Sequence, residues 1–146
     1  MIKSVSDAFT QLERTLADDI GFCLFTVLLV DLPDVVRVHS SNPKYYPVTG
    51  RKRMGPTPWG GHVIMGGKPW LGLTPGDLEW AFPDHALIAS LGCGCCISIP
   101  VQDDGQTIGT LNLLDTEQRY TVDHLTRAEK YADRFVPLTK AAMSGA

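Results

Sequence analysis

Three of the four cysteines of this chain lie within one short segment, at Cys93, Cys95 and Cys96, which we call the cysteine cluster. A cysteine thiol can act as a nucleophile or a redox group where a nearby histidine or helix end lowers its pKa. The same residues could instead fill a core, because cysteine also behaves as a small hydrophobic side chain. A structural zinc site would need a second ligand pair, which the sequence lacks, so we expect no metal.

Two histidines, His62 and His85, precede the cysteine cluster. Each falls in or at the start of a short predicted helix, on the side expected to face a pocket. A cysteine beside a histidine is the minimum for an activated thiol nucleophile. If a cysteine reacts, one of these histidines is therefore the candidate base; otherwise both are ordinary surface or core residues.

Aromatic residues are concentrated in the middle of the chain. Small-molecule pockets are mostly apolar with a few polar groups, so these rings are candidates for pocket walls. They could equally be core fillers. The aromatic residues that we expect to bind a ligand are Trp59, Trp70 and Tyr45, with Trp80 and Tyr46 nearby.

Two features of the same region favour an anionic ligand. Gly60 and Gly61 open a helix predicted over 57–66, where free backbone N–H groups and the positive end of the helix dipole attract anions. The preceding loop, 41–58, contains basic residues such as Arg53. They could form a lid that attracts an anion, or only a solvated loop. We therefore expect a carboxylate, nitrate or phosphate-sized group between this helix and the strand of the cysteine cluster.

Composition limits the classes to which the protein can belong. The 146 residues suffice for one domain over 1–146, and 44% apolar with 20% charged residues is typical of globular proteins. A net charge of -3 gives no general attraction to nucleic acid. The longest apolar run, 21–30, is too short to span a bilayer, and the cysteine spacing does not suit a disulfide framework. We expect a cytoplasmic protein without a nucleic-acid or membrane partner.

Hydrophobic periodicity predicts the elements that must hold these residues. Apolar residues recur every three or four positions over 4–20 and 121–135, which indicates two amphipathic terminal helices, the second ended or kinked by Pro137. A further short helix over 84–92 is expected to be capped by Asp84. Strands are indicated over 22–30, 35–40, 69–73, 96–101 and 107–114.

These elements predict an α+β fold with an antiparallel sheet of five or six strands. The terminal helices would cover one face of the sheet, and the irregular middle of the chain would cover the other, leaving a pocket. A polar turn is expected after the strand over 69–73. Alternation along the strand would place Cys93 and Cys95 on one side and Cys96 on the other.

The C-terminal third of the sequence resembles the GAF domain family. The residues that carry the resemblance are the strand 96–101, which ends in Pro100-Val101, the hairpin at Gly105, and the strand Ile108-Gly109-Thr110-Leu111-Asn112-Leu113 before a closing helix. The resemblance implies a pocket for a small ligand and a homodimer formed through the terminal helices. Because the chain ends soon after the last expected helix, we expect it to act without an attached output domain.

One GAF-like enzyme, free methionine-(R)-sulfoxide reductase, has a segment similar to Phe82-Pro83-Asp84-His85. Where that enzyme has cysteines, this chain has Ala86, Leu87 and Ile88 after the histidine and Gly60 in the earlier helix, so that activity is not expected. Two functions remain. The first is binding of a small polar or anionic ligand, without a cofactor, in a pocket between the 57–66 helix, the 84–92 helix and the sheet; the alternative is a small cysteine-dependent enzyme that uses the same pocket.

Overall fold

Six strands form one antiparallel sheet in the order β3-β2-β1-β6-β5-β4. The computed structural model describes residues 4–145. The strands are β1 (Leu24–Asp31), β2 (Asp34–Ser40), β3 (Lys52–Arg53), β4 (Trp70–Gly72), β5 (Cys95–Asp103) and β6 (Gln106–Asp115). The helices are α1 (Val5–Asp19), the π-helix η1 (Gly60–Met65), α2 (Pro75–Ala81), α3 (His85–Ser90), α4 (Val122–Glu129) and α5 (Ala132–Gly145).

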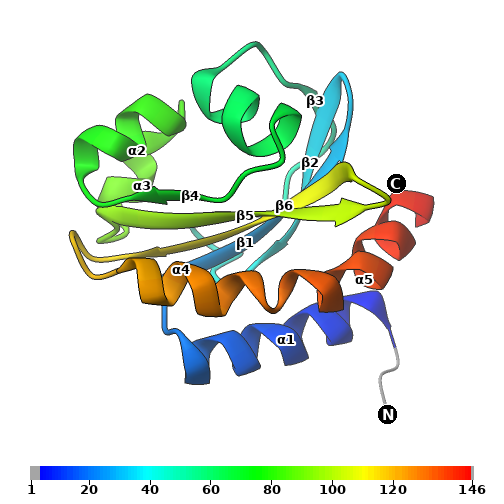
Figure 1. The fold of residues 1–146 in the computed structure, drawn as a ribbon, viewed down its shortest axis with the longest axis horizontal. Helices are drawn as coiled ribbons and strands as arrows, with labels where there is room; N and C mark the ends of the chain where they lie inside the picture. The colour runs from blue at the N-terminus through cyan, green and yellow to red at the C-terminus, as the bar shows by residue number, and fades with distance from the viewer. Residues whose placement is uncertain (1–3, 146) are drawn as a thin grey trace.

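Helices cover the two faces of this sheet in different ways (Figure 1). The helices α1, α4 and α5 lie together below the sheet, as expected for the terminal helices. The helices α2 and α3 and the irregular segment between β2 and β4 lie above it. The predicted α+β fold is confirmed.

The face under the terminal helices is a continuous apolar core. Alternate residues of each long strand point into it, for example Ile97 and Ile99 of β5 and Leu111 and Leu113 of β6. Phe135 of α5 is fully buried against them. We call this layer the helix-face core.

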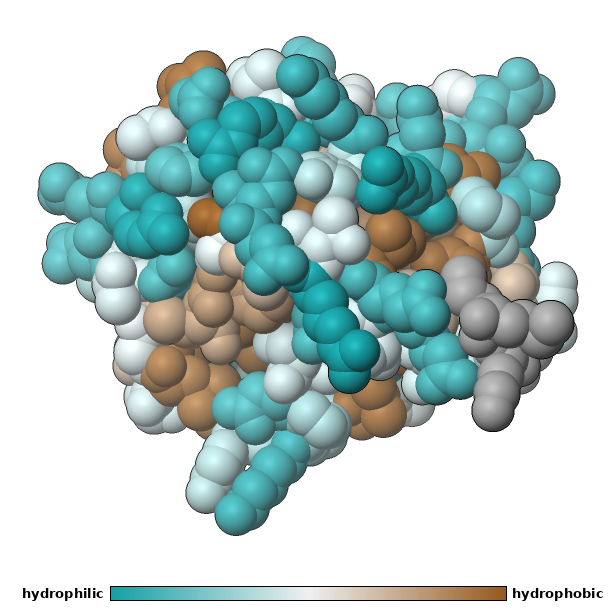
Figure 2. Space-filling model, turned by 90° about the horizontal axis from the view of Figure 1, so that it is seen from below, coloured by the Kyte–Doolittle hydropathy of each residue, from teal (hydrophilic) through white to brown (hydrophobic). Residues whose placement is uncertain are grey.

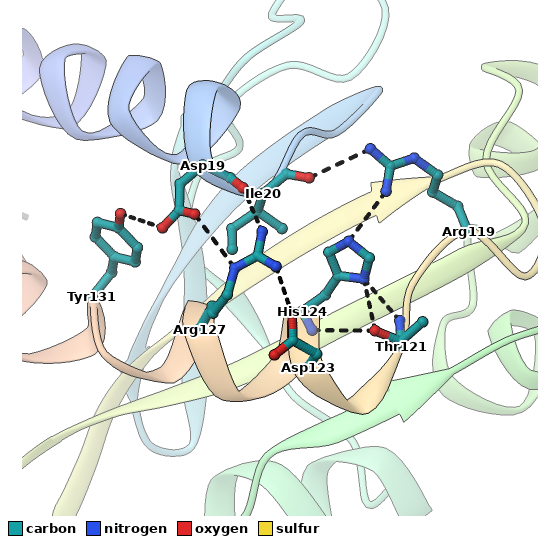
Figure 3. Close-up of polar contacts among 8 residues, drawn as sticks. All are labelled: Asp19, Ile20, Arg119, Thr121, Asp123, His124, Arg127 and Tyr131. Atoms are coloured by element: carbon teal, nitrogen blue, oxygen red, sulfur yellow. Dashed lines mark hydrogen bonds and ion pairs between the residues drawn. The ribbon is translucent and has the colours of Figure 1, made fainter.

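Polar contacts fasten α4 to the end of α1 (Figure 3). The Arg127 guanidinium donates to the carboxylate of Asp123 at 2.6 Å and to the main-chain carbonyl of Asp19 at 2.6 Å. The Tyr131 hydroxyl donates to the Asp19 carboxylate at 2.6 Å. At the start of α4, Thr121 and His124 cap each other's backbone N–H groups, so His124 has a structural role.

The C-terminal helix differs from the prediction. It is divided between α4 and α5 near Lys130, and it continues to Gly145 with Pro137 inside α5. The prediction that Pro137 ends or kinks the helix near 135 was therefore wrong about where the helix ends. Burial of Phe135 and Thr139 on either side of the proline holds this part of α5 against the sheet, which offsets the loss of one helical hydrogen bond.

Helix α2 was missed, because the residues after β4 read as a polar turn. Thr74 accepts the backbone N–H of Asp77, and Asp77 accepts that of Thr74 in return. This capping box, with Pro75 in the first turn, is a helix-start signal. The helix buries Leu78 and Ala81 above the sheet.

Candidate functional site

A cavity of about 250 Å³ lies between the sheet and the segments above it. Its floor is formed by the central strands β1, β2 and β6, and its walls by the loop before η1 and the connection from α2 to α3. Most of the lining is apolar, including Leu28, Met54, Trp59, Ala81 and Phe82. We call it the central cavity.

The floor of the central cavity carries a row of buried polar side chains. In the strand register, Ser98 of β5 pairs with Asn112 of β6, and Asn112 pairs with Thr26 of β1. All three are nearly inaccessible to solvent, and Asn112 and Thr26 line the cavity. Buried polar groups need hydrogen-bond partners, so this row is a costly feature to retain unless it is used.

Hydrogen bonds join this row to one wall of the cavity. The indole Nε1 of Trp59 donates to Ser98 Oγ at 3.1 Å, and Ser98 Oγ donates to Asn112 Oδ1 at 2.7 Å. Asn112 Nδ2 then donates to Thr110 Oγ1 at 3.2 Å. Thr26 lies beside Asn112 on the cavity floor.

Charged groups stand at the rim of the central cavity. Arg37, Lys52 and Arg53 line it on one side and Asp84 on the other, which leaves an excess of positive charge. Within the described residues, neither Lys52 nor Arg53 has an ion-pair partner. Such a rim favours an anion.

Arg37 is held in place by three contacts. Its guanidinium lies 3.8 Å from the centre of the Tyr46 ring, donates to the carbonyl of Pro47 at 2.9 Å and contacts the Asp84 carboxylate at 3.5 Å. The Tyr46 hydroxyl also donates to Asp84, at 2.6 Å. Burial and this bond raise the pKa of Tyr46 well above its usual value. Asp84 occupies the N-cap position of α3, but its side chain accepts no hydrogen bond from the helix, contrary to the expectation. Its carboxylate instead contacts Arg37 and Tyr46 at the rim.

A model of the GAF domain family matches residues 7–136 of the sequence, which is most of the chain. The chain belongs to the GAF domain family. This confirms the resemblance seen in the C-terminal third of the sequence. No curated protein matches the sequence.

Solved GAF structures share the whole fold. The GAF domain/HD domain protein from Geobacter sulfurreducens superposes with a TM-score of 0.77 at 13% identity, covering 96% of this chain and 94% of that one. The GAF domain of a two-component sensor histidine kinase from Bacillus halodurans gives 0.77 at 16% identity, covering 98% and 99%. A free methionine-R-sulfoxide reductase from Neisseria meningitidis, in complex with its substrate, gives 0.69 at 18% identity, covering 97% and 81%. At these identities the likeness shows the fold alone.

The cysteine cluster of this GAF domain is split between the two faces of the sheet. Cys95 belongs to the helix-face core, whereas Cys93 and Cys96 pack with Leu24, Leu78 and Ile88 on the other side. The prediction that Cys93 and Cys95 share a side was wrong, because β5 begins at Cys95 and Cys93 precedes the regular alternation. None of the three lines the central cavity.

The environment of every thiol disfavours the thiolate. Burial raises the pKa of Cys93 to about 12 and also raises the pKa of Cys95 and Cys96. Cys23, the exposed cysteine, donates to the Asp115 carboxylate at 3.1 Å. Burial and this bond raise its pKa to about 11. At neutral pH all four thiols keep their protons, which is the opposite of an activated nucleophile.

Among residues 4–145, neither candidate histidine forms a hydrogen bond with a cysteine. His62 is exposed, and its Nε2 lies 3.0 Å from the carbonyl of Pro69. His85 is half-buried at the start of α3. Neither lines the central cavity. The described residues also hold no group of three or more histidine, cysteine or acidic side chains placed to bind a metal.

The predicted ligand-binding residues are only partly brought together. Trp59 and Arg53 line the central cavity, but Tyr45 is exposed beside Lys44, and Trp70 stacks on Trp80 outside the cavity. The N–H groups of Gly60 and Gly61 are already used, since they donate to the side-chain and main-chain oxygens of Thr57. The start of this helix therefore offers few free donors to an anion.

The sequence analysis missed Arg37, Thr26, Ser98 and Asn112. A signal for the last three was present: Thr26 and Ser98 each follow and precede apolar residues on the same side of their strands, and Asn112 lies with Thr110 between Ile108 and Leu114. Polar residues at core positions of strands are uncommon unless they have partners, so these three could have been proposed as a row facing a site.

Proposed function

We propose that this GAF domain binds a small anionic ligand in the central cavity. GAF domains generally bind small ligands. The observation that carries the proposal is the combination of a cationic rim, apolar walls and a polar buried floor in one cavity. The ligand's anionic group would lie among Arg37, Lys52 and Arg53, and its apolar part against Trp59 and Phe82.

The proposed site borders the pocket expected between the 57–66 helix, the 84–92 helix and the sheet, since Trp59 and Asp84 line the central cavity. In this proposal side chains of β2 and β3 hold the anion, rather than the N–H groups of Gly60 and Gly61. An arginine and two basic neighbours attract a carboxylate from a distance, and the low polarity of the walls strengthens that attraction.

Calorimetric titration with benzoate and its uncharged isostere benzamide tests this proposal. We expect benzoate to bind more tightly, and we expect the double variant K52A/R53A to weaken benzoate binding by about threefold to tenfold. Lys44→Ala is the matched control, because Lys44 is a loop lysine that contacts Tyr45 and does not line the cavity. Equal binding of the two probes, or an equal loss in the Lys44 variant, would contradict the proposal.

The alternative of a cysteine-dependent enzyme finds little support in the geometry. Three thiols are buried away from the cavity, and all four have raised pKa values. We expect iodoacetamide at neutral pH to label Cys23 first and slowly, as the exposed thiol. Fast labelling of one residue of the cysteine cluster, located by peptide mass spectrometry, would restore the enzyme hypothesis.

We also propose that two copies associate through the terminal helices. Figure 2 shows this face of the molecule: polar side chains cover most of it, and hydrophobic side chains are visible in separate patches. Val122 at the start of α4 is 67% exposed. Sedimentation at micromolar concentration should give the mass of a dimer, and the mass of a monomer would contradict this proposal.

Within residues 4–145, no helix is long and apolar enough to cross a membrane.

A further inference from the structure

The hydrogen bonds behind the cavity floor have a fixed direction. An indole N–H can only donate, so Ser98 Oγ must accept from Trp59. A serine hydroxyl has one proton, and Ser98 has Asn112 as its short partner at 2.7 Å. In the structure the Ser98 hydroxyl donates this proton to Asn112 Oδ1, so the carbonyl oxygen of the amide faces Ser98.

Cys96 closes the remaining position on Ser98. Its Sγ lies 3.6 Å from Ser98 Oγ, and both residues are fully buried. Because burial keeps the thiol protonated, its S–H is available to donate to the second lone pair of Ser98. The hydroxyl is then saturated, with two donors facing it and its own proton on Asn112. This gives Cys96 a role that needs no reactivity.

These bonds fix the orientation of the Asn112 amide. With Oδ1 occupied by Ser98, the Nδ2 group must lie on the other side of the amide, where it donates one hydrogen to Thr110. Nδ2 has a second hydrogen, for which residues 4–145 supply no partner, and Asn112 lines the central cavity. The floor of the cavity therefore offers a fixed donor next to the hydroxyl of Thr26.

We propose that Asn112 is a specificity-determining residue that donates a hydrogen bond to an acceptor group on the ligand, and that Ser98 fixes it in that orientation. This inference rests on the proposed function, and it adds which residue contacts the end of the ligand that lies away from the cationic rim. The ligand class is a small anion with an oxygen acceptor, such as a carbonyl or a second carboxylate, at the end away from the rim. Ligands with an apolar group there leave the buried donor without a partner.

Two probes of similar shape separate these features. 4-Acetylbenzoate has a carboxylate and a ketone acceptor at opposite ends of a ring, and 4-isopropylbenzoate replaces the ketone by an apolar group. Calorimetry on the wild-type protein should show 4-acetylbenzoate binding about threefold to tenfold more tightly, the usual worth of one buried hydrogen bond.

Variants then assign the preference to the amide. Asn112→Asp keeps the shape and an acceptor for Ser98 but removes the donor, so it should abolish or reverse the preference. Ser98→Ala frees the amide to turn and should reduce the preference while 4-isopropylbenzoate binding stays within about twofold. Thr26→Val is the matched control on the same floor, because it removes a neighbouring hydroxyl without touching the Trp59–Ser98–Asn112 bonds. It should retain most of the preference. Thermal unfolding of each variant verifies that it is folded.

The outcomes separate the two proposals. If both probes bind the wild-type protein equally, or if the folded Asn112 and Ser98 variants retain the full preference, the role of Asn112 is overturned and the anion site stands. If neither probe binds, the proposed function fails, and the role of Asn112 fails with it.

Discussion

The same strands build two layers of opposite character. Below the sheet, the strand side chains in the helix-face core are apolar except His39 of β2, which stacks on Phe9 and contacts Glu13 of α1, and α1 and α5 close over them. Above it, Thr26, Ser98 and Asn112 replace apolar residues, and the covering segments leave a cavity. The first layer is a continuous apolar core that stabilises the fold. The second also contains apolar clusters, but they surround polar groups and a cavity that cost stability and that, in our proposal, serve a ligand.

Neighbours in the sequence show this division most directly. Cys95 and Cys96 are adjacent, yet Cys95 packs in the helix-face core and Cys96 contacts Ser98 behind the cavity floor. The residue type is the same, and the strand pleat decides its neighbours. A cluster in sequence is therefore not a cluster in space when it lies along a strand.

The largest effect should come from removing a ring below the sheet. Phe135→Ala leaves a void in a layer with no exposure to water and should lower the free energy of unfolding by about 3–5 kcal/mol. The same change on the other face, Phe82→Ala, should cost only about 1–2 kcal/mol, because Phe82 is half-buried and borders a cavity. Urea unfolding of both variants measures the difference, and equal losses would contradict the division into two layers.

Alkaline pH should destabilise the protein through its buried thiols. The pKa of Cys93 rises from 9.0 to about 12 on folding, so above pH 9 the unfolded chain loses a proton that the folded chain keeps. The stability present below pH 9 is therefore lost as pH rises, by up to roughly 1.4 kcal/mol per pH unit for this thiol. Urea unfolding between about pH 8 and about pH 11, a range around the ordinary thiol pKa of about 9, measures this loss. The free energy of unfolding should fall less steeply with pH in the variant Cys93→Ala. An unchanged pH dependence would mean that folding does not raise the pKa of Cys93.

A smaller effect is expected at the rim of the cavity. Tyr46→Phe removes the 2.6 Å bond to Asp84 and should lower the free energy of unfolding by about 1–2 kcal/mol. Tyr45→Phe is the matched control, since Tyr45 is exposed and its hydroxyl has no hydrogen bond among residues 4–145; it should change stability by less than about 0.5 kcal/mol. Urea unfolding distinguishes them, and similar values would show that the Asp84 contact contributes nothing.

Much of the fold could be predicted from the sequence because its signals are local. The strand at Ile108 to Leu113 and the hairpin at Gly105 follow from alternation and turn residues, and Gly105 has a positive φ of 78°. Helix α2 shows the limit of this approach: its capping residues were present, but a seven-residue helix gives too short a periodic pattern to stand out.

The site could be predicted only in part because it depends on contacts distant in sequence. Trp59 and Arg53 were expected in the pocket and line the central cavity. Arg37 is held at the rim by Tyr46, Pro47 and Asp84, which no local pattern links to it. The positions of Cys93 and Cys95 depended on where β5 begins, and a shift of one residue reverses the face of every side chain.

Crystals grown or soaked with 4-acetylbenzoate test the central claim most directly. Binding in the central cavity predicts density for the carboxylate near Arg37 and Arg53, with the ketone oxygen within hydrogen-bond distance of Asn112 Nδ2. Density at the start of η1, where Gly60 and Gly61 lie, or an empty cavity at saturating probe would contradict the account.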